Sequence, residues 1–173
     1  MLKTLRVGVV GHGFMGKVHG HAYRSFNFYY DPPPAHIVLA GVATRTETSW
    51  RRAVESWGYE FGTTEVEELC ARDDIDLIDC CAPNYAHRDV LLAAIEHGKH
   101  VYMDKPLCLD MGQAREMTAA AAAHPECITQ MTFNYRFVPA LLRAKELVAV
   151  SYTHLRAHKT VLDLVCRLLL EKK

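Results

Sequence analysis

Short apolar runs alternate along this chain with longer segments in which apolar residues recur at a helical period. The runs contain valine or isoleucine and span four to eight residues, which is typical of buried strands. We expect strands at residues 6–10, 36–43, 75–82, 100–103 and 127–133, with a shorter one at 59–62. The segments between them predict helices at residues 14–26, 48–57, 65–71, 84–97 and 110–123.

Proline, glycine and capping residues mark the ends of several predicted elements. Three prolines at residues 32–34 break the chain before the second strand, because each removes a backbone donor. Gly58 is placed to end a helix and Asn84 to begin one, and Asp110 with Gln113 resembles a capping box. Strands separated by helices cannot pair as hairpins and imply right-handed crossovers. The sequence therefore predicts an α/β fold with a doubly wound, mostly parallel sheet.

Three glycines, Gly11, Gly13 and Gly16, mark the passage from the first predicted strand into the first turn of the first predicted helix. Glycine in regular structure costs roughly 0.5–1 kcal/mol relative to alanine, so three together need a cause. In a doubly wound sheet the first allows a tight turn, the second lets a diphosphate approach, and the third lets the helix pack closely. The helix N-terminus then offers unpaired N–H groups to the phosphates. We interpret this turn, with Phe14 and Met15, as the dinucleotide-binding turn of a Rossmann-like domain.

The end of the second predicted strand bears on which nicotinamide dinucleotide binds. An acidic residue there would hydrogen-bond the ribose 2′-hydroxyl and repel a 2′-phosphate. The sequence instead has Thr44 followed by Arg45, and a hydroxyl beside a guanidinium suits a 2′-phosphate. Two alternatives remain: Glu47 binds the ribose of NAD, or Arg45 is simply a solvated side chain. We expect NADP or NAD, with NADP slightly favoured.

The composition is that of an ordinary globular protein and narrows the classes of partner. The 173 residues are 50% hydrophobic and 23% charged, and 20 basic residues balance 20 acidic ones. A formal net charge of zero and the lack of a basic patch give no support to nucleic-acid binding. No apolar run approaches the ~18 residues of a membrane span, and the N-terminal run is too short for a secretory signal. We expect a cytoplasmic protein that binds neither nucleic acid nor membrane.

The six cysteines and a His-x-His pair are candidate metal ligands, but their spacing favours other roles. No cysteine stands in a C-x-x-C pair, and Cys80 and Cys81 adjoin in a predicted buried strand. We expect reduced thiols, without a disulfide framework or a zinc site. His19 and His21 are two residues apart on a predicted helix and face different directions, which favours a structural or solvent role. We therefore expect no metal site.

Four segments together resemble the N-terminal half of the Gfo/Idh/MocA oxidoreductases. They are GVVGHGFMGKVHGHAY, VATRTE, CAPNYAHRDVLLAAIEHGKHVYMDKPL and MTFNYRFVPALLRAKEL, and the resemblance covers residues 5–148. The third segment is the most specific, with a Pro-Asn loop, a histidine that opens a helix, and a Lys-Pro pair. The resemblance implies NAD(P)-dependent oxidation or reduction, usually at a sugar, inositol or related polyol carbon.

The resemblance also implies roles for particular residues. The family's loop along the cofactor is matched by Ala82, Pro83, Asn84 and His87. Lys105 matches the lysine of the family's Glu-Lys-Pro motif, which contacts the substrate hydroxyl and the nicotinamide ribose, and the preceding acid here is the shorter Asp104. The position of Lys105 in the predicted fold supports the same role. It follows the carboxyl end of the fifth strand, and open α/β sheets bind ligands at the carboxyl ends of their strands. A surface lysine paired with Asp104 is the alternative. We expect both residues to be catalytic.

Four further predictions concern the division of the chain into domains and the residues near its end. Asn134 and Arg136 follow the sixth strand, and roles in substrate binding and in joining two domains stay equally open. We place the dinucleotide-binding domain at residues 1–127, and the sixth strand with the start of a truncated second domain at 128–149. Residues 150–173 match nothing in the family pattern and are expected to be a non-native tail, with an amphipathic helix as the alternative.

These features together predict the cofactor-binding part of a larger enzyme. The parent protein is expected to be an NAD(P)-dependent dehydrogenase or reductase acting on a sugar, inositol or related polyol. We expect the parent to be a homo-oligomer through the missing domain, and the 173-residue chain to bind dinucleotide without turnover. A non-catalytic NAD(P)-binding sensor of the same superfamily is the alternative, and the retained Asp-Lys-Pro motif favours the enzyme.

Overall fold

The computed structural model describes residues 2–155, with side chains described as far as residue 148. The chain divides into two compact units, Met1–Thr132 and Phe133–Lys173. Among residues 2–155, no helix is both long enough and apolar enough to cross a membrane.

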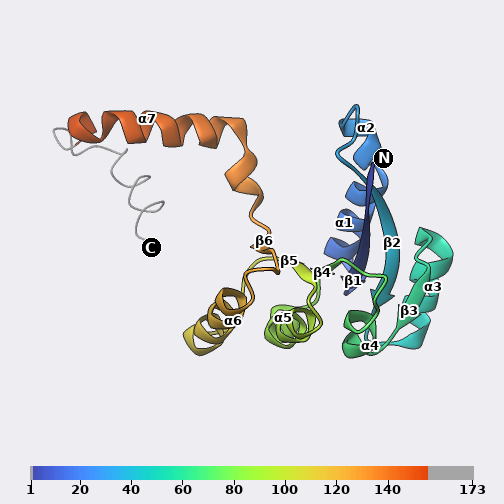
Figure 1. Cartoon of the computed structure of the whole chain (residues 1–173). Coiled ribbons are helices and arrows are strands. Elements are labelled where there is room, and N and C mark those ends of the chain that lie inside the picture. Colours follow the sequence, from blue (N-terminus) through green and yellow to red (C-terminus); the bar gives the residue numbers. More distant parts are fainter. Residues whose placement is uncertain (1, 156–173) are drawn as a thin grey trace. The chain divides into compact units, whose positions relative to one another are not determined.

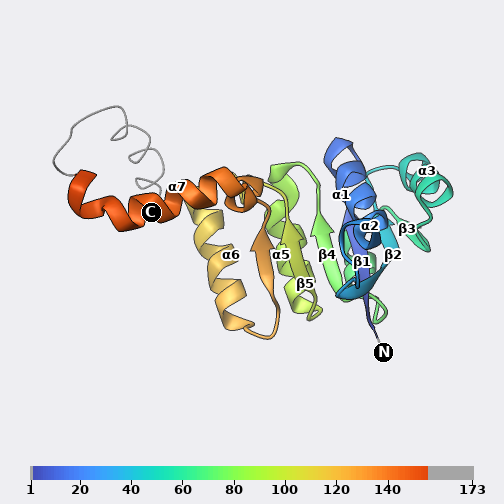
Figure 2. The ribbon, with the colours of Figure 1, turned by 90° about the horizontal axis from the view of Figure 1, so that it is seen from above.

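The first unit is built on a single sheet of six parallel strands, seen along its layers in Figure 1 and from above in Figure 2. The strands are β1 (Lys3–Val10), β2 (Ala35–Ala43), β3 (Phe61–Thr63), β4 (Leu77–Cys80), β5 (His100–Met103) and β6 (Thr129–Met131). Their order is β3-β2-β1-β4-β5-β6, and every neighbouring pair is parallel. The predicted doubly wound α/β fold is confirmed. The order reverses between β1 and β4, which is where such sheets bind ligands.

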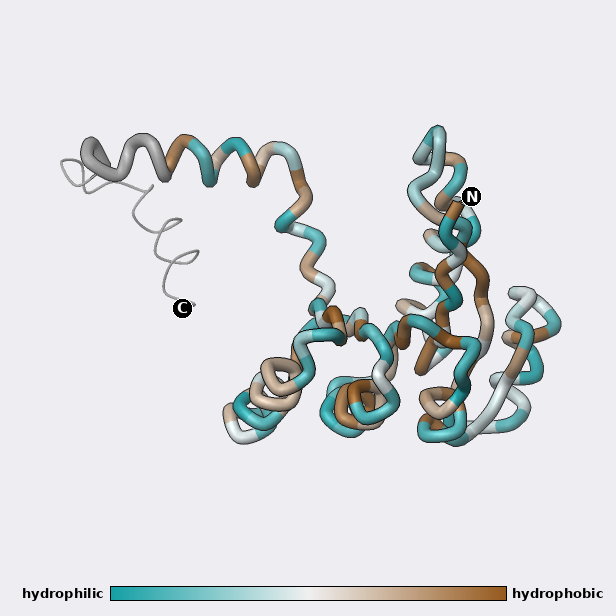
Figure 3. The backbone as a smooth tube through the Cα atoms, viewed as in Figure 1, coloured by the Kyte–Doolittle hydropathy of each residue, from teal (hydrophilic) through white to brown (hydrophobic). Residues whose placement is uncertain are grey.

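Helices cover the sheet on both faces. They are α1 (Phe14–Arg24), the short α2 (Phe26–Tyr29), α3 (Glu47–Trp57), α4 (Val66–Cys70), α5 (His87–Glu96) and α6 (Met111–Ala123). One buried cluster joins the sheet to α1 and α3 through Val7, Val9, Leu39, Val42, Ala53 and Tyr59, with Tyr23 packed against it. A second cluster joins the opposite face to α4, α5 and α6 through residues such as Ile78, Val101, Leu69, Leu91 and Met117. The hydropathy of the chain follows this layering, with apolar segments along the strands and in α5 (Figure 3).

Most predicted element boundaries agree with the structure within a few residues, and the exceptions have physical causes. Asp110 caps α6 as predicted, because its carboxylate accepts the Gln113 amide at 2.9 Å. Gly58 ends α3 with the positive φ of 69° that glycine readily adopts. The prediction that Asn84 caps the next helix is wrong. Asn84 lies inside a 3-10 turn, η1 (Asn84–Ala86), and α5 begins only at His87.

The second unit contains a 3-10 turn, η2 (Asn134–Phe137), and helix α7 (Pro139–Leu155). The sixth strand, β6, pairs with residues Val101–Met103 of β5 and therefore belongs to the first unit. The boundary between the two units falls after Thr132 rather than after residue 127. The expectation of a non-native tail concerns residues 150–173, and residues 156–173 lie outside the part that the structure describes.

Candidate functional site

The glycine turn joins β1 to α1, and two of its glycines are required by the packing of the protein itself. Gly11 has a φ of +89°, and a Cβ atom placed there would lie 2.8 Å from the backbone nitrogen of Ala82. A Cβ atom on Gly16 would collide with the carbonyl oxygen of Gly11. The turn is therefore held tightly between helix α1 and the loop that follows β4.

Gly13 differs from both, because no protein atom needs the space that its missing side chain leaves. A Cβ atom there would meet nothing within 4 Å, and its φ of −78° is open to any residue. Gly13 is the N-cap of α1, and no side chain of the described residues caps this helix end. The first-turn amides of α1 therefore lack intrahelical partners. Phe14, beside them, is exposed.

The turn is also tied to the end of β2. The amide of Gly11 donates to the carbonyl oxygen of Ala43 at 2.8 Å. The next residue, Thr44, is nearly buried, and its hydroxyl donates to the carbonyl oxygen of Thr46 at 2.9 Å. The Thr44 hydroxyl is therefore already committed as a donor.

Two charged side chains follow Thr44, and they differ in their partners. Glu47, the first residue of α3, accepts from Arg51 one turn later at 2.5 and 2.8 Å. Arg45 is exposed and makes no ion pair within residues 2–148. The guanidinium of Arg45 is thus the charged group at this strand end that remains available to a ligand.

A buried histidine connects the loops that follow β4 and β5. The side chain of His87 is only 1% exposed. Its Nε2 atom lies 2.9 Å from the carbonyl oxygen of Ala82, and its Nδ1 atom lies 2.8 Å from that of Pro106. Pro83 is exposed and Asn84 is half-buried above this contact. His87 therefore lies beneath the loop, holding it, rather than on its open side.

The Asp-Lys-Pro segment directly follows β5. Asp104 is almost buried, and its Oδ1 atom accepts from the backbone amide of Lys105 at 2.8 Å and from the hydroxyl of Thr132 at 2.9 Å. The Lys105 side chain is exposed, and within residues 2–148 its ammonium makes no ion pair, with Asp104 or any other acid. The peptide bond between Lys105 and Pro106 is cis.

These contacts bring most of the predicted site residues to one edge of the sheet, at the carboxyl ends of β1, β2, β4 and β5. The glycine turn contacts Ala82, Ala82 contacts His87, and His87 contacts Pro106 beside Lys105. Asn134 and Arg136 lie in η2 of the second unit, where both are exposed. Their predicted roles remain predictions.

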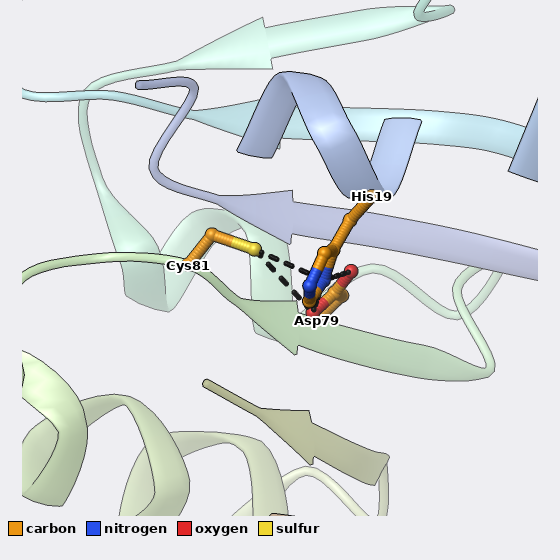
Figure 4. Close-up of side chains that lie close together, drawn as sticks. All are labelled: His19, Asp79 and Cys81. Carbon is orange, nitrogen blue, oxygen red and sulfur yellow. Dashed lines mark hydrogen bonds and ion pairs between the residues drawn. The ribbon is translucent and has the colours of Figure 1, made fainter. Parts of the chain in front are cut away.

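One polar cluster was not anticipated from the sequence. Asp79 of β4 is fully buried, and its carboxylate accepts from His19 of α1 at 2.9 Å and from the Tyr23 hydroxyl at 2.9 Å (Figure 4 shows His19, Asp79 and Cys81). Cys81 lies 3.2 Å from Nδ1 of His19. His21 is exposed, as its spacing from His19 suggested. The available signal was an acid inside a predicted buried strand, since a buried carboxylate needs a partner.

Comparison with known proteins agrees with this arrangement. Residues 5–133 match the family model described as "Oxidoreductase family, NAD-binding Rossmann fold", GFO_IDH_MocA. Levoglucosan dehydrogenase of Pseudarthrobacter phenanthrenivorans is 31% identical over 147 residues, which is 85% of this chain and 37% of that protein. Inositol 2-dehydrogenase/D-chiro-inositol 3-dehydrogenase of Lactiplantibacillus plantarum is 25% identical over 83% of this chain and 39% of its own length.

Solved structures give the same result. Levoglucosan dehydrogenase in complex with NADH and levoglucosan superposes with a TM-score of 0.80 at 31% identity, over 86% of this chain and 40% of that one. Scyllo-inositol dehydrogenase from Lactobacillus casei with bound NAD(H) and scyllo-inositol has a TM-score of 0.76 at 25% identity. This match covers 87% of the present chain and 42% of the dehydrogenase chain. The chain spans about two fifths of the length of the curated relatives it matches. By fold, by glycine turn and by sequence, the chain belongs to the Gfo/Idh/MocA family of oxidoreductases.

Proposed function

We propose that residues 2–132 form the nicotinamide-dinucleotide-binding domain of a dehydrogenase that acts on a sugar, inositol or related polyol. Bound at this sheet edge, the cofactor would accept or supply the hydride. The relatives named levoglucosan dehydrogenase and inositol 2-dehydrogenase support this substrate class. Because the chain spans about two fifths of such proteins, we further propose that it is part of a longer, homo-oligomeric enzyme and does not turn over substrate alone.

Gly13 is the observation that carries this proposal. The protein's own packing accounts for Gly11 and Gly16, but it leaves the position of Gly13 open. A bare backbone in front of an uncapped helix N-terminus suits a group that must come close and that carries negative charge. A diphosphate satisfies both conditions, because the first-turn amides of α1 can donate to its oxygens and the helix dipole favours its charge. Phe14 and Met15 would flank it.

Arg45 supports a 2′-phosphate on the adenosine ribose. It follows the nearly buried Thr44 at the end of β2, carries no ion pair within residues 2–148, and offers a planar pair of donors. Glu47 is engaged by Arg51, which leaves it less free to accept a ribose diol. NADP(H) is therefore proposed as the slightly preferred cofactor. NAD(H) stays within the proposal because NADH-bound neighbours share the fold.

Lys105 is proposed to act on the substrate hydroxyl. Its exposed ammonium extends from the carboxyl end of β5, and it can stabilise or exchange a hydroxyl proton as hydride moves. Asp104 is proposed to serve the reaction by holding the Lys105 backbone and the end of β6 through its two hydrogen bonds. Ala82, Pro83 and Asn84 would line the nicotinamide side of the site, with His87 supporting them from below. Asn134 and Arg136 are proposed as substrate contacts.

A binding titration tests the proposal directly. The purified 173-residue chain is titrated with NADH and with NADPH while tryptophan emission and the melting temperature are recorded. Saturable quenching with a rise in melting temperature is expected for at least one dinucleotide, since a ligand at a hundredfold excess over its Kd adds about 2.7 kcal/mol to the unfolding free energy. No response to either dinucleotide at millimolar concentration would contradict the proposal.

A further inference from the structure

The His19–Asp79 contact lies directly behind the glycine turn. His19 follows Gly16 by one turn of α1, and Asp79 precedes Cys81 by two residues along β4. A Cβ atom on Gly16 would lie 3.7 Å from the Cβ of Cys81, so α1 and the end of β4 are in close contact at this point. Any shift of α1 against β4 would therefore move the turn itself.

The contact between His19 and Asp79 matters for stability because the carboxylate of Asp79 is buried. Asp79 has no exposed surface, and a buried carboxylate without compensation is strongly unfavourable. Both of its oxygens face His19 Nδ1, at 2.9 and 3.1 Å, and the Tyr23 hydroxyl donates to Oδ2 at 2.9 Å. Both partners come from α1. These two contacts to Asp79 persist only while α1 keeps its place on β4, and the remaining donor is the Cys81 thiol, 3.6 Å from Oδ1.

We propose that protonated His19 and Asp79 form a buried ion pair that positions the glycine turn, so that affinity for a nicotinamide dinucleotide falls when His19 loses its proton. The inference rests on the proposed function and adds to it a positioning residue, His19, which lies one turn after Gly16 on α1. Loss of the proton leaves Asp79 with a neutral partner and removes a positive charge from behind the turn that receives the diphosphate. Both effects weaken binding.

The surroundings of His19 support the charged form. Burial alone would lower the pKa of His19, but the hydrogen bond and the charge of Asp79, with a further contribution from the charge of Asp104, raise it above its usual 6.5. The other groups that face this ring are the Tyr102 ring on β5, at a centroid distance of 5.8 Å, and the Cys81 thiol. Burial and the charge of Asp79 raise the pKa of Cys81, so this neighbour remains a neutral thiol.

A metal ion is the competing explanation for the same side chains. One ligand atom from each of His19, Asp79 and Cys81 lies within 4.8 Å of the others. The distances between them are, however, those of hydrogen bonds, and the Cys81 thiol itself donates to Asp79 Oδ1 at 3.6 Å. The ion pair accounts for the buried carboxylate without a cation.

The test measures the pH dependence of binding in the full 173-residue chain. NADH affinity, or NADPH affinity if that is tighter, is determined from pH 6 to 9.5 for the wild type, for His19→Gln and for His21→Gln. His21 lies on the same helix and is exposed, which makes it the matched control. The wild type and His21→Gln should lose affinity roughly tenfold as pH rises, within the usual range of coupling between sites. His19→Gln should lack this step and bind at all pH values as the wild type does at high pH.

A nuclear magnetic resonance titration of the histidine ring protons gives a second readout, and it keeps the inference testable should His19→Gln not fold. The wild-type His19 signal should titrate above pH 6.5, and its midpoint should rise further when dinucleotide saturates the protein, because the coupling is reciprocal. A midpoint that dinucleotide leaves unchanged, or an equal pH dependence in the wild type and His19→Gln, would overturn the inference while leaving the proposed function intact. A Co²⁺ complex with a thiolate absorption band that Cys81→Ser abolishes would overturn it in favour of a metal site. Failure of the wild type to bind either dinucleotide would overturn the proposed function as well.

Discussion

The Nδ1 atom of His87 lies 2.8 Å from the carbonyl oxygen of Pro106, the residue that follows Lys105. Through its other ring nitrogen the same side chain reaches the carbonyl oxygen of Ala82 at 2.9 Å. One buried imidazole thereby fixes the spacing between the loop after β4 and the loop after β5. In the proposed function, these two loops carry the groups that meet the nicotinamide and the substrate.

Removal of this imidazole should destabilise the domain. His87→Ala is expected to lower the unfolding free energy by roughly 2–4 kcal/mol, because it leaves a cavity at a buried position and removes the imidazole contacts to the carbonyl oxygens of Ala82 and Pro106. Urea unfolding followed by circular dichroism measures the loss. His21→Ala, at an exposed position of α1, should stay within experimental error of the wild type. Equal midpoints for His87→Ala and the wild type would refute a supporting role.

Lys105 is predicted to matter for turnover and hardly at all for folding or for cofactor affinity. Its side chain is exposed and carries no ion pair within residues 2–148, so Lys105→Met in this chain should leave the melting temperature and NADH affinity nearly unchanged. In a full-length family protein that carries this domain, the same substitution should lower kcat by at least a hundredfold, which is within the usual contribution of a positioned proton donor or acceptor. Steady-state kinetics on that protein provide the check, and undiminished turnover would remove Lys105 from the mechanism.

Arg45 is predicted to discriminate between the two dinucleotides. Arg45→Ala should weaken NADPH binding about tenfold and leave NADH binding within about twofold, because only the 2′-phosphate offers a charged partner for the guanidinium. Parallel titrations of the wild type and the variant with both cofactors give the comparison. An equal loss for both dinucleotides would assign Arg45 to a different part of the ligand, and no loss for either would leave it a solvated side chain.

The order of strands and helices was predictable because it depends on local signals. The apolar runs, the breaks at Gly58 and before β2, and the cap at Asp110 each act within a few residues. The glycine turn was predictable for the same reason, since G-x-G-x-x-G after a valine-rich strand is a contiguous pattern. The error at Asn84 arose from the same kind of signal, because a capping residue type does not reveal that a 3-10 turn comes first.

Contacts between distant residues could not be predicted from the sequence in this way. His19 and Asp79 are sixty positions apart, and the single sequence gives no sign that α1 brings an imidazole against β4. The assignment of His87 to the cofactor loop came from the family resemblance, which does not distinguish a side chain on the loop from one beneath it. Its burial and its two carbonyl partners required the packed structure.

The stability of the domain should depend on pH through His19. Because its folded pKa is raised, the pair contributes stability that is fully present below the unfolded value of 6.5 and is lost as pH rises through the folded pKa. The difference in unfolding free energy between the wild type and His19→Gln should therefore shrink between pH 6 and 9. Urea unfolding at each pH measures it, with His21→Gln as the control that should show no such change. A difference that grows with pH would require His19 to be neutral in the fold.

The central claim is that the space in front of Gly13 exists for a ligand, and one substitution tests it most directly. Gly13→Ala should leave the unfolding free energy within about 1 kcal/mol of the wild type, since its Cβ meets no protein atom within 4 Å and only the preference of the cap position changes. Dinucleotide affinity of the same variant should fall at least tenfold, because the methyl group occupies the approach of the diphosphate. Gly16→Ala, whose Cβ collides with Gly11, should by contrast destabilise the fold itself. A folded Gly13→Ala protein that binds NADH and NADPH as tightly as the wild type would contradict the account.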